Sequence, residues 1–190
     1  MTKILRIESS IKGGASVTRK LTGTLAAKLG GTVTERDTQG IAMIDADWVA
    51  AAYTPAGERT AEQKAKLRLS DELIAELRAA DAIVIGMPVY NFGVTGPLKA
   101  WIDQICRVGE TFAYSDKGPK GLLADKPVYV AYASGGVAMG SGYDFASTYL
   151  RQVLGFVGLN NVSFVAAEGV AADEAAAVAR AEVAIAALAA

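Results

Sequence analysis

Two aromatic side chains and a carboxamide follow a continuous apolar segment of the chain. Ala82-Ile83-Val84-Ile85-Gly86 contains no polar side chain, and Met87-Pro88-Val89-Tyr90-Asn91-Phe92 comes directly after it. Such a run is typical of a parallel strand buried on both faces, which would place the aromatics at its carboxyl end. A flat ring could bind against Tyr90 and Phe92, and Asn91 with backbone amides could stabilise negative charge on it. The alternative is a rigid proline turn with aromatics packed on the sheet.

A second segment carries hydroxyls and glycines ahead of a helix. Ser9-Ser10-Ile11-Lys12-Gly13-Gly14-Ala15-Ser16-Val17-Thr18 follows a short apolar run at 4–7, and a helix is expected over about 17–28. The unpaired amides and dipole of a helix N-terminus stabilise a phosphate. Helix capping by Ser16 explains the same residues equally well. The loop has neither the GxGxxG nor the P-loop pattern, which argues against a tightly bound dinucleotide.

A third loop is rich in glycine. Ala133-Ser134-Gly135-Gly136 follows the apolar run 128–132, and glycine lets backbone amides approach a ring edge closely. This loop could close the far side of a flat ligand, or it could simply be a flexible turn.

Composition excludes several classes of function. The chain has 19 basic and 20 acidic residues and a net charge of −1, so neither nucleic acid nor an anionic membrane is expected as a partner. Its apolar runs end before the length of about 20 residues that a membrane-spanning helix needs. No basic segment followed by an apolar stretch opens the chain, which predicts a cytoplasmic location.

The chain contains no histidine, the commonest general base and a common metal ligand. No metal site is expected. Its single cysteine, Cys106, lies in an apolar stretch with helical spacing, which favours a small core residue over a nucleophile. A bound organic cofactor is therefore the expected source of any chemistry.

The elements that position these loops alternate between strand and helix. Strands are expected at 4–7, 32–37, 82–86, 128–132 and 162–166. Helices are expected at about 17–28, 60–80, 97–105 and 146–154 and over the alanine-rich C-terminal segment, with a short helix and a lid-like connection within 41–57. Thr60-Ala61-Glu62-Gln63 has the spacing of a capping box, and Pro97 suits a first helical turn. The pattern predicts one α/β domain over residues 1–190, a doubly wound parallel sheet whose ligand lies beyond the strands' carboxyl ends.

Jointly, these segments resemble the FMN-dependent NADH:azoreductase and quinone reductase family, which has a flavodoxin-like fold with strand order 2-1-3-4-5 and helices on both faces. The resemblance covers most of the chain. It rests on Ser9-Ser10, Ser16-Val17-Thr18, Pro88-Val89-Tyr90-Asn91-Phe92, Leu98-Lys99-x-Trp101-Ile102-Asp103, Thr111-Phe112-x-Tyr114, Gly118-Pro119-x-Gly121-Leu122 and Leu154-Gly155-Phe156-x-Gly158.

The resemblance implies a tightly but non-covalently bound FMN, with NADH or NADPH as electron donor and quinones or azo compounds reduced in a ping-pong cycle. The phosphate would be bound by Ser10, Ser16, Val17 and Thr18, the ring by Pro88, Val89, Tyr90, Asn91 and Phe92, and its other side by Ala133, Ser134, Gly135 and Gly136. Chemistry would reside in the flavin, with Asn91 as a stabiliser of its reduced form.

The resemblance further implies a homodimer with the substrate pocket at the subunit interface. Tyr53, Phe112 and Tyr114 would line that pocket, although surface or dimer packing would bury the same rings. Two positions depart from the family pattern, since Val17 stands where a polar residue is common and Ser134 where arginine is often found. Cofactor affinity and nicotinamide preference could both differ.

Three alternatives remain. A flavodoxin-type electron carrier would share the fold and cofactor, but a near-neutral chain lacks the charged docking face that carriers use. A phosphoacceptor signalling domain would need clustered acids after the first strand, where only Glu8 stands. A serine hydrolase using Ser9 or Ser10 would lack its histidine, leaving only lysine-based variants.

Overall fold

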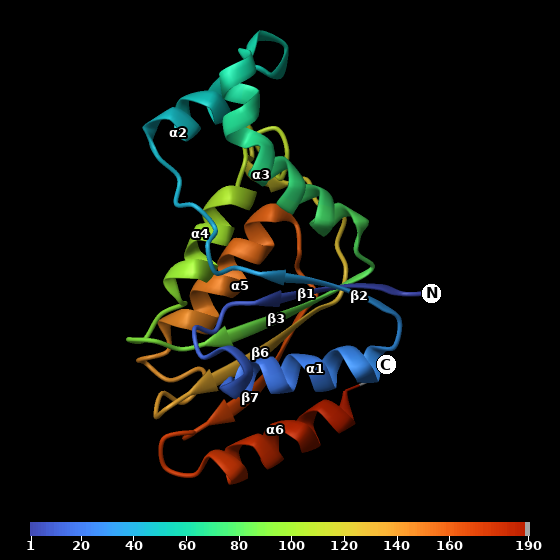
Figure 1. Cartoon of the computed structure of the whole chain (residues 1–190), viewed down its shortest axis with the longest axis vertical. Coiled ribbons are helices and arrows are strands. Elements are labelled where there is room, and N and C mark those ends of the chain that lie inside the picture. Colours follow the sequence, from blue (N-terminus) through green and yellow to red (C-terminus); the bar gives the residue numbers. More distant parts are fainter. Residues whose placement is uncertain (189–190) are drawn as a thin grey trace.

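A five-stranded parallel sheet runs through the middle of the protein, with helices on both faces (Figure 1). The computed structural model describes residues 1–188. The strands of this sheet are β1 (Lys3–Glu8), β2 (Thr32–Asp37), β3 (Ala82–Pro88), β6 (Val128–Ser134) and β7 (Val162–Glu168). They lie in the order β2-β1-β3-β6-β7, which confirms the doubly wound α/β fold and the order 2-1-3-4-5 expected from the sequence.

The central and edge strands differ in burial. Every residue of β3 is buried, as its continuous apolar run predicted. In the edge strand β2 only Arg36 is partly buried, and it forms ion pairs with Glu72 and Glu76 of α3 (Ala61–Ala79). A charged, polar strand of this kind suits an edge that faces solvent.

Two hydrophobic clusters cover the two faces of the sheet. On one face lie α3, α4 (Gly96–Ile105) and α5 (Phe145–Val157), and on the other lie α1 (Val17–Leu29) and α6 (Glu174–Ala187) (Figure 1). β1 shows the alternation that this arrangement requires, because Leu5 and Ile7 belong to the first cluster and Ile4 to the second.

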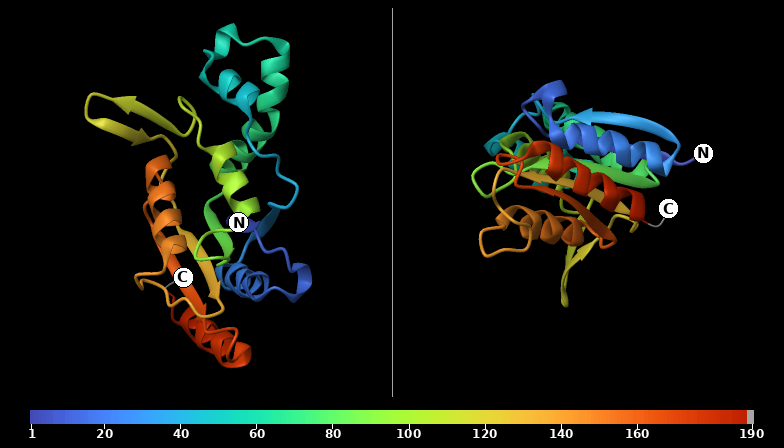
Figure 2. Two further views of the ribbon diagram at one scale, coloured as in Figure 1. Left: turned by 90° about the vertical axis from the view of Figure 1, so that its left-hand side faces the viewer. Right: turned by 90° about the horizontal axis from the view of Figure 1, so that it is seen from below.

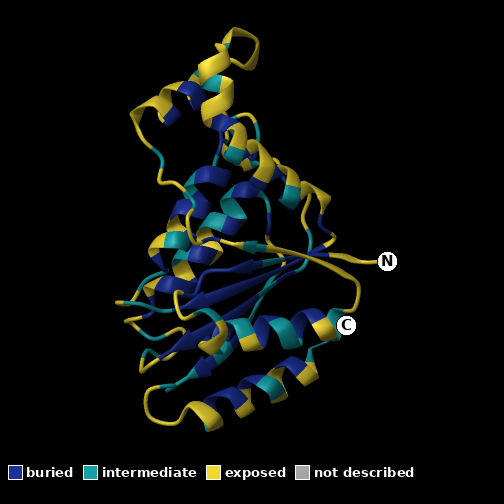
Figure 3. Ribbon diagram, in the orientation of Figure 1, coloured by how far each residue is buried: buried dark blue, intermediate teal, exposed yellow. Residues whose placement is uncertain are grey.

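The helix-start signals of the sequence are confirmed. Thr60 and Gln63 form the expected capping box at the start of α3, and a proline lies in the first turn of α4. The short helix expected within 41–57 is α2 (Ala46–Tyr53), which packs on α3. Its Trp48 is buried and donates to the Gln104 carboxamide at 2.9 Å. Figure 3 shows that α2 and the start of α3 form a largely exposed projection beyond the buried sheet.

A β-hairpin, β4 (Phe112–Ser115) and β5 (Gly118–Gly121), projects away from the sheet (Figure 2). The sequence does not predict it, because short strands with glycine and proline carry weak strand signals. Its base lies against the end of α5, where a Cβ added at Gly121 would come within 2.2 Å of the Gly158 backbone nitrogen. Glycine is therefore required at this contact.

Cys106 lies directly after α4, which ends at Ile105, rather than inside a helix. The helix ends where its apolar face predicts, and Cys106 is its C-cap residue. Cys106 is partly buried and packs against the core, as a small apolar residue would. Within residues 1–188, no helix combines the length and apolar character needed to cross a membrane.

Candidate functional site

The loops that follow β1, β3 and β6 line one cavity of about 340 Å³ at the carboxyl ends of these strands. The strand order reverses between β1 and β3, which is the position where doubly wound sheets bind ligands. The volume falls in the range of small-molecule sites. The cavity is lined by Ser10, Lys12, Ser16, Val17, Thr18, Pro88, Val89, Tyr90, Ala133, Ser134, Gly135, Val170, Ala171 and Glu174.

The first loop ends in the N-cap of α1. The Ser16 hydroxyl accepts from the Arg19 amide at 3.2 Å and lies 3.0 Å from the Thr18 hydroxyl. Capping by Ser16 is therefore confirmed, and it leaves the amides of Val17 and Thr18 without partners inside the helix. Two hydroxyls and two amides converge at the positive end of the helix dipole, an arrangement that suits a phosphate group.

The two serines before this loop have different surroundings, although both are buried. Ser9 donates to the Gly86 carbonyl at 2.6 Å and so joins the ends of β1 and β3. Ser10 accepts from the Lys12 amide at 3.2 Å and lines the cavity. Ser9 is therefore a structural residue, whereas Ser10 is placed to contact a ligand.

The second loop contains a tight turn between Tyr90 and Gly93. The Tyr90 amide donates to the Gly93 carbonyl at 3.2 Å, and the Gly93 amide donates back at 3.1 Å. Both residues between them are left-handed, with φ of 50° at Asn91 and 69° at Phe92. Asparagine adopts this conformation readily, but at a bulky residue it costs about 1–2 kcal/mol. Strain of this kind is concentrated at functional sites.

Hydrogen bonds fix the third loop to its neighbours. The Val89 amide donates to the Ala133 carbonyl at 2.8 Å, which joins the loops after β3 and β6. Ser134 and Tyr132 both donate to the Val137 carbonyl, the tyrosine at 3.0 Å. Because the Ser134 hydroxyl donates within its own loop, its proton is not free for a ligand, and this position supplies no cation on this wall of the cavity.

A buried acid lies behind the first loop. Glu8 is fully buried, and its Oε1 accepts from the Thr22 hydroxyl at 2.5 Å and lies 3.3 Å from Arg6 Nε. Burial raises the pKa of Glu8 above its usual value, while the Thr22 hydrogen bond and the charges of Arg19 and Arg6 oppose the rise.

Most of the residues expected to hold a phosphate and a flat ring meet in this cavity. The exceptions are Asn91, Phe92 and Gly136, which are exposed and do not line it. The Phe92 ring instead lies near Tyr143, with ring centroids 6.3 Å apart.

The three aromatics expected to contact a substrate do not line the cavity either. Tyr53 ends α2 and Tyr114 lies on the hairpin, and both are exposed. Phe112 is buried, with its ring centroid 4.5 Å from that of Phe156. Packing thus accounts for Phe112, and within one chain the structure does not bring these three rings to the site.

Four lining residues were not expected from the sequence: Lys12, Val170, Ala171 and Glu174. Val170 and Ala171 follow β7, and their amides donate to the carbonyls of Ser134 and Gly135 at 3.0 and 3.3 Å. In a parallel sheet the carboxyl ends of all strands lie on the same side. The sequence could therefore have indicated that the loop after the last strand also reaches the cavity.

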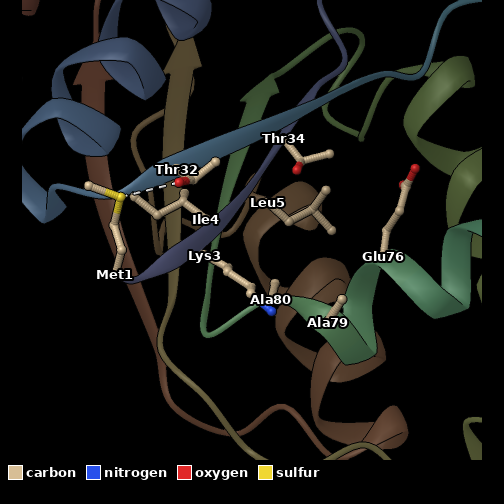
Figure 4. Close-up of a pocket in the computed structure, with 9 residues that line it drawn as sticks. All are labelled: Met1, Lys3, Ile4, Leu5, Thr32, Thr34, Glu76, Ala79 and Ala80. Carbon is tan, nitrogen blue, oxygen red and sulfur yellow. Dashed lines mark hydrogen bonds between the residues drawn. The ribbon is translucent and has the colours of Figure 1, made fainter.

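A second cavity, of about 450 Å³, lies by the start of β1 (Figure 4). It is lined mainly by the first residues of β1, by Thr32 and Thr34 of β2, and by the end of α3. Its Glu76 is already paired with Arg36. The cavity is larger than the first, but it lies at the amino ends of the strands, away from the ligand position of this fold. Within residues 1–188, no cluster of histidine, cysteine, aspartate and glutamate could hold a metal ion.

The fold and the position of the cavity define a protein class, and sequence comparison identifies it. A family model described as flavodoxin-like fold matches residues 2–189, so the chain belongs to this family. An FMN-dependent NADH:quinone oxidoreductase 1 from Jannaschia sp. (strain CCS1) is 52% identical over the full length of both chains. An FMN-dependent NADH:quinone oxidoreductase from Cereibacter sphaeroides (strain KD131 / KCTC 12085) is 50% identical, also over both full lengths.

Solved structures agree with this assignment. An azoreductase from Bacillus anthracis str. Sterne superposes with a TM-score of 0.84 at 27% identity, covering 97% of this chain and 99% of its own. An FMN-dependent NADH-azoreductase from Bacillus anthracis str. Ames Ancestor, in complex with FMN, also gives 0.84, at 25% identity and with 97% and 96% coverage.

Proposed function

We propose that this protein is an FMN-dependent oxidoreductase that uses NADH or NADPH to reduce quinones and azo compounds. The observation that carries the proposal is the cavity at the carboxyl ends of β1, β3 and β6, which joins a helix N-terminus suited to phosphate with two loops suited to a flat ring. Relatives that are half identical over their full length bear this activity in their names.

The residues of the cavity fit FMN. The hydroxyls of Ser10, Ser16 and Thr18 and the first amides of α1 would hold the phosphate. The Tyr90 hydroxyl is buried and has no hydrogen-bond partner among the described residues, so it offers a polar group to a ligand. Pro88, Val89, Ala133 and Gly135 give the cavity an apolar or glycine wall of the kind that an aromatic ring requires.

When bound, FMN would accept a hydride from the nicotinamide and pass two electrons to the acceptor. The protein would position the flavin ring and polarise it. The loops containing Val89 and Ala133, which are joined by a hydrogen bond, would hold two sides of the ring. Asn91, which follows the cavity-lining Tyr90, would stabilise the reduced, anionic ring. No histidine is present, so protons would come from solvent.

We also propose a single FMN-binding domain over residues 1–190 that forms a homodimer, with the active site at the subunit interface. Large apolar side chains are exposed along the loop after β6 and beside it, namely Phe92, Met139, Tyr143 and Phe145. Exposed aromatic groups of this kind mark interaction surfaces. Residues from a second copy, such as Tyr53 or Tyr114, would then complete the acceptor pocket. A cytoplasmic location would suit a chain whose one cysteine cannot form an internal disulfide.

Spectroscopy of the purified protein tests the activity. The protein should be yellow or become yellow with FMN, bleach anaerobically with NADH and regain its colour with a small quinone. Steady turnover without a separate reductase separates an enzyme from an electron carrier of the same fold. Parallel double-reciprocal plots of rate against the concentration of one substrate, at several fixed concentrations of the other, would support a ping-pong cycle. A colourless protein that cannot be reconstituted with FMN contradicts the proposal.

A further inference from the structure

Glu8 belongs to a cluster of charges immediately behind the loop that suits a phosphate. Arg6 forms ion pairs with Glu8 and Glu35, and Arg19 forms ion pairs with Glu35 and Asp37. The cluster joins β1, β2 and the first turn of α1, the turn that also contains Thr18. Two cations face three carboxyl groups, so the cluster carries a net charge of −1 when Glu8 is ionised and is neutral when Glu8 is protonated.

One oxygen of Glu8 has no partner. Oε1 accepts from Thr22, but Oε2 is buried without a hydrogen bond among the described residues. Oε2 would lie 2.9 Å from a Cβ added at Gly86, and the Thr18 hydroxyl would lie 3.4 Å from the same point. The unpaired oxygen and the hydroxyl thus share the space above Gly86. An ionised oxygen without a donor is costly to bury, and protonation removes that cost.

Groups from β1, α1, β2 and β3 surround Glu8. β1 contributes Arg6, α1 contributes Arg19 with the hydroxyls of Thr18 and Thr22, and β3 contributes only the backbone of Gly86. β2 contributes Glu35, whose charge opposes ionisation of Glu8. The two arginines are shared with Glu35 and Asp37. A phosphate at the N-terminus of α1 would add negative charge beside a cluster whose two arginines are already shared among three carboxyl groups.

We propose that Glu8 takes up a proton when the FMN phosphate binds, so that this buried carboxyl couples cofactor affinity to pH. The inference rests on the proposed function, because it requires FMN to bind in this cavity. Phosphate binding disfavours the ionised form of Glu8, so by linkage the affinity for FMN falls as pH rises between the pKa of Glu8 in the free protein and its pKa in the complex. Within that window the fall approaches about tenfold per pH unit.

Calorimetric titration of the flavin-free full-length protein with FMN tests this coupling. Titrations from pH 5.5 to pH 8.5, in buffers of different ionisation enthalpy, count the protons taken up per FMN. The phosphate has a second pKa of about 6, so its own titration contributes at the acid end. Riboflavin, which lacks the phosphate, should bind without proton uptake by the protein. Glu8→Gln, which stays neutral, should bind FMN with the uptake lost and without the Glu8-dependent fall in affinity that the wild-type protein shows as pH rises.

Glu174→Gln is the matched control, because Glu174 is an exposed acid that lines the same cavity. This variant should shift FMN affinity by a similar factor at every pH and keep the proton uptake. If Glu8→Gln does not fold, carbon-13 NMR of the wild-type Glu8 carboxyl gives the same answer, since its titration should move to higher pH with FMN and not with riboflavin.

The possible failures are distinguishable. FMN that binds tightly with equal proton uptake in wild type and Glu8→Gln, or with a Glu8 titration that FMN does not move, overturns this inference and leaves the proposed function intact. Absence of FMN binding at every pH overturns both.

Discussion

The Ser9 hydroxyl donates a hydrogen bond of 2.6 Å to the Gly86 carbonyl, and this buried contact joins the end of β1 to β3 beneath the cavity. Ser9→Ala leaves the carbonyl without this partner, so we expect the free energy of unfolding to fall by about 1–2 kcal/mol. Urea denaturation measures the change. Ser115→Ala, which removes an exposed hydroxyl that donates to a carbonyl at 2.8 Å, should cost less than about 0.5 kcal/mol. Equal losses of unfolding free energy in the two variants would show that burial of the Ser9 hydrogen bond adds nothing to stability.

The left-handed conformation of Asn91 separates its backbone role from its side-chain role. Asn91→Gly keeps the turn available, whereas Asn91→Ala should be less stable than Asn91→Gly by about 1 kcal/mol because alanine resists this φ. Thermal unfolding of the flavin-free variants tests the difference. If the carboxamide stabilises the reduced ring, both variants should lower the flavin reduction potential equally. Unchanged potentials in both would exclude that role.

Ser16 has two roles, as a helix cap and as a phosphate contact, and a pair of variants separates them. Ser16→Ala removes both and should cost about 1 kcal/mol of stability. Ser16→Asp keeps a capping oxygen but places a negative charge where the phosphate should bind. We expect its flavin-free form to be as stable as wild type, with FMN binding weakened at least tenfold and riboflavin binding nearly unchanged. Equal loss of both flavins would place the phosphate elsewhere.

The sequence predicts those parts of the structure that depend on local pattern. The buried run of β3, the capping box at Thr60 and the loops after β1 and β3 could all be found, because strand burial and helix starts leave periodic or positional signals. The strand order came from the family resemblance. The loop that contains Lys12 was found, although this side chain was not singled out within it, whereas Glu174 was missed because its placement depends on how distant loops meet.

Two further features had no local signal. The hairpin from Phe112 to Gly121 is held by its contact with Gly158, which lies far along the chain, and its strands are too short to show a pattern. The pairing of Arg6 with Glu8 places charges on the buried α1 side of β1, where a period-2 pattern predicts apolar residues. Tertiary contacts, rather than propensity, decide both.

Cys106 should be an unreactive thiol. Burial raises its pKa to about 11, and Asp103 acts in the same direction. At pH 8 only about 0.1% of such a thiol is ionised, and the thiolate is the nucleophile. Alkylation by iodoacetamide at pH 8 should therefore be at least a hundredfold slower than that of N-acetylcysteine, and should accelerate as pH rises toward 11. Cys106→Ala should retain full quinone turnover. Rapid alkylation of the folded protein at pH 8 would contradict the packing role.

Phe112 and Tyr114 are neighbours on the hairpin, with ring centroids 5.6 Å apart, but they differ in exposure, so truncation of the two side chains should change stability by very different amounts. Phe112 is buried against Phe156, so Phe112→Ala should lower the free energy of unfolding by about 3 kcal/mol. Tyr114 is 68% exposed, so Tyr114→Ala should leave the stability of the isolated chain within about 0.5 kcal/mol of the wild-type value.

If Tyr114 meets the acceptor across a dimer interface, Tyr114→Ala should raise KM for the quinone and leave the rate of flavin reduction by NADH unchanged. Sedimentation analysis of the variant separates this outcome from a broken dimer, since a monomeric Tyr114→Ala protein would make the side chain an interface residue and not a substrate contact.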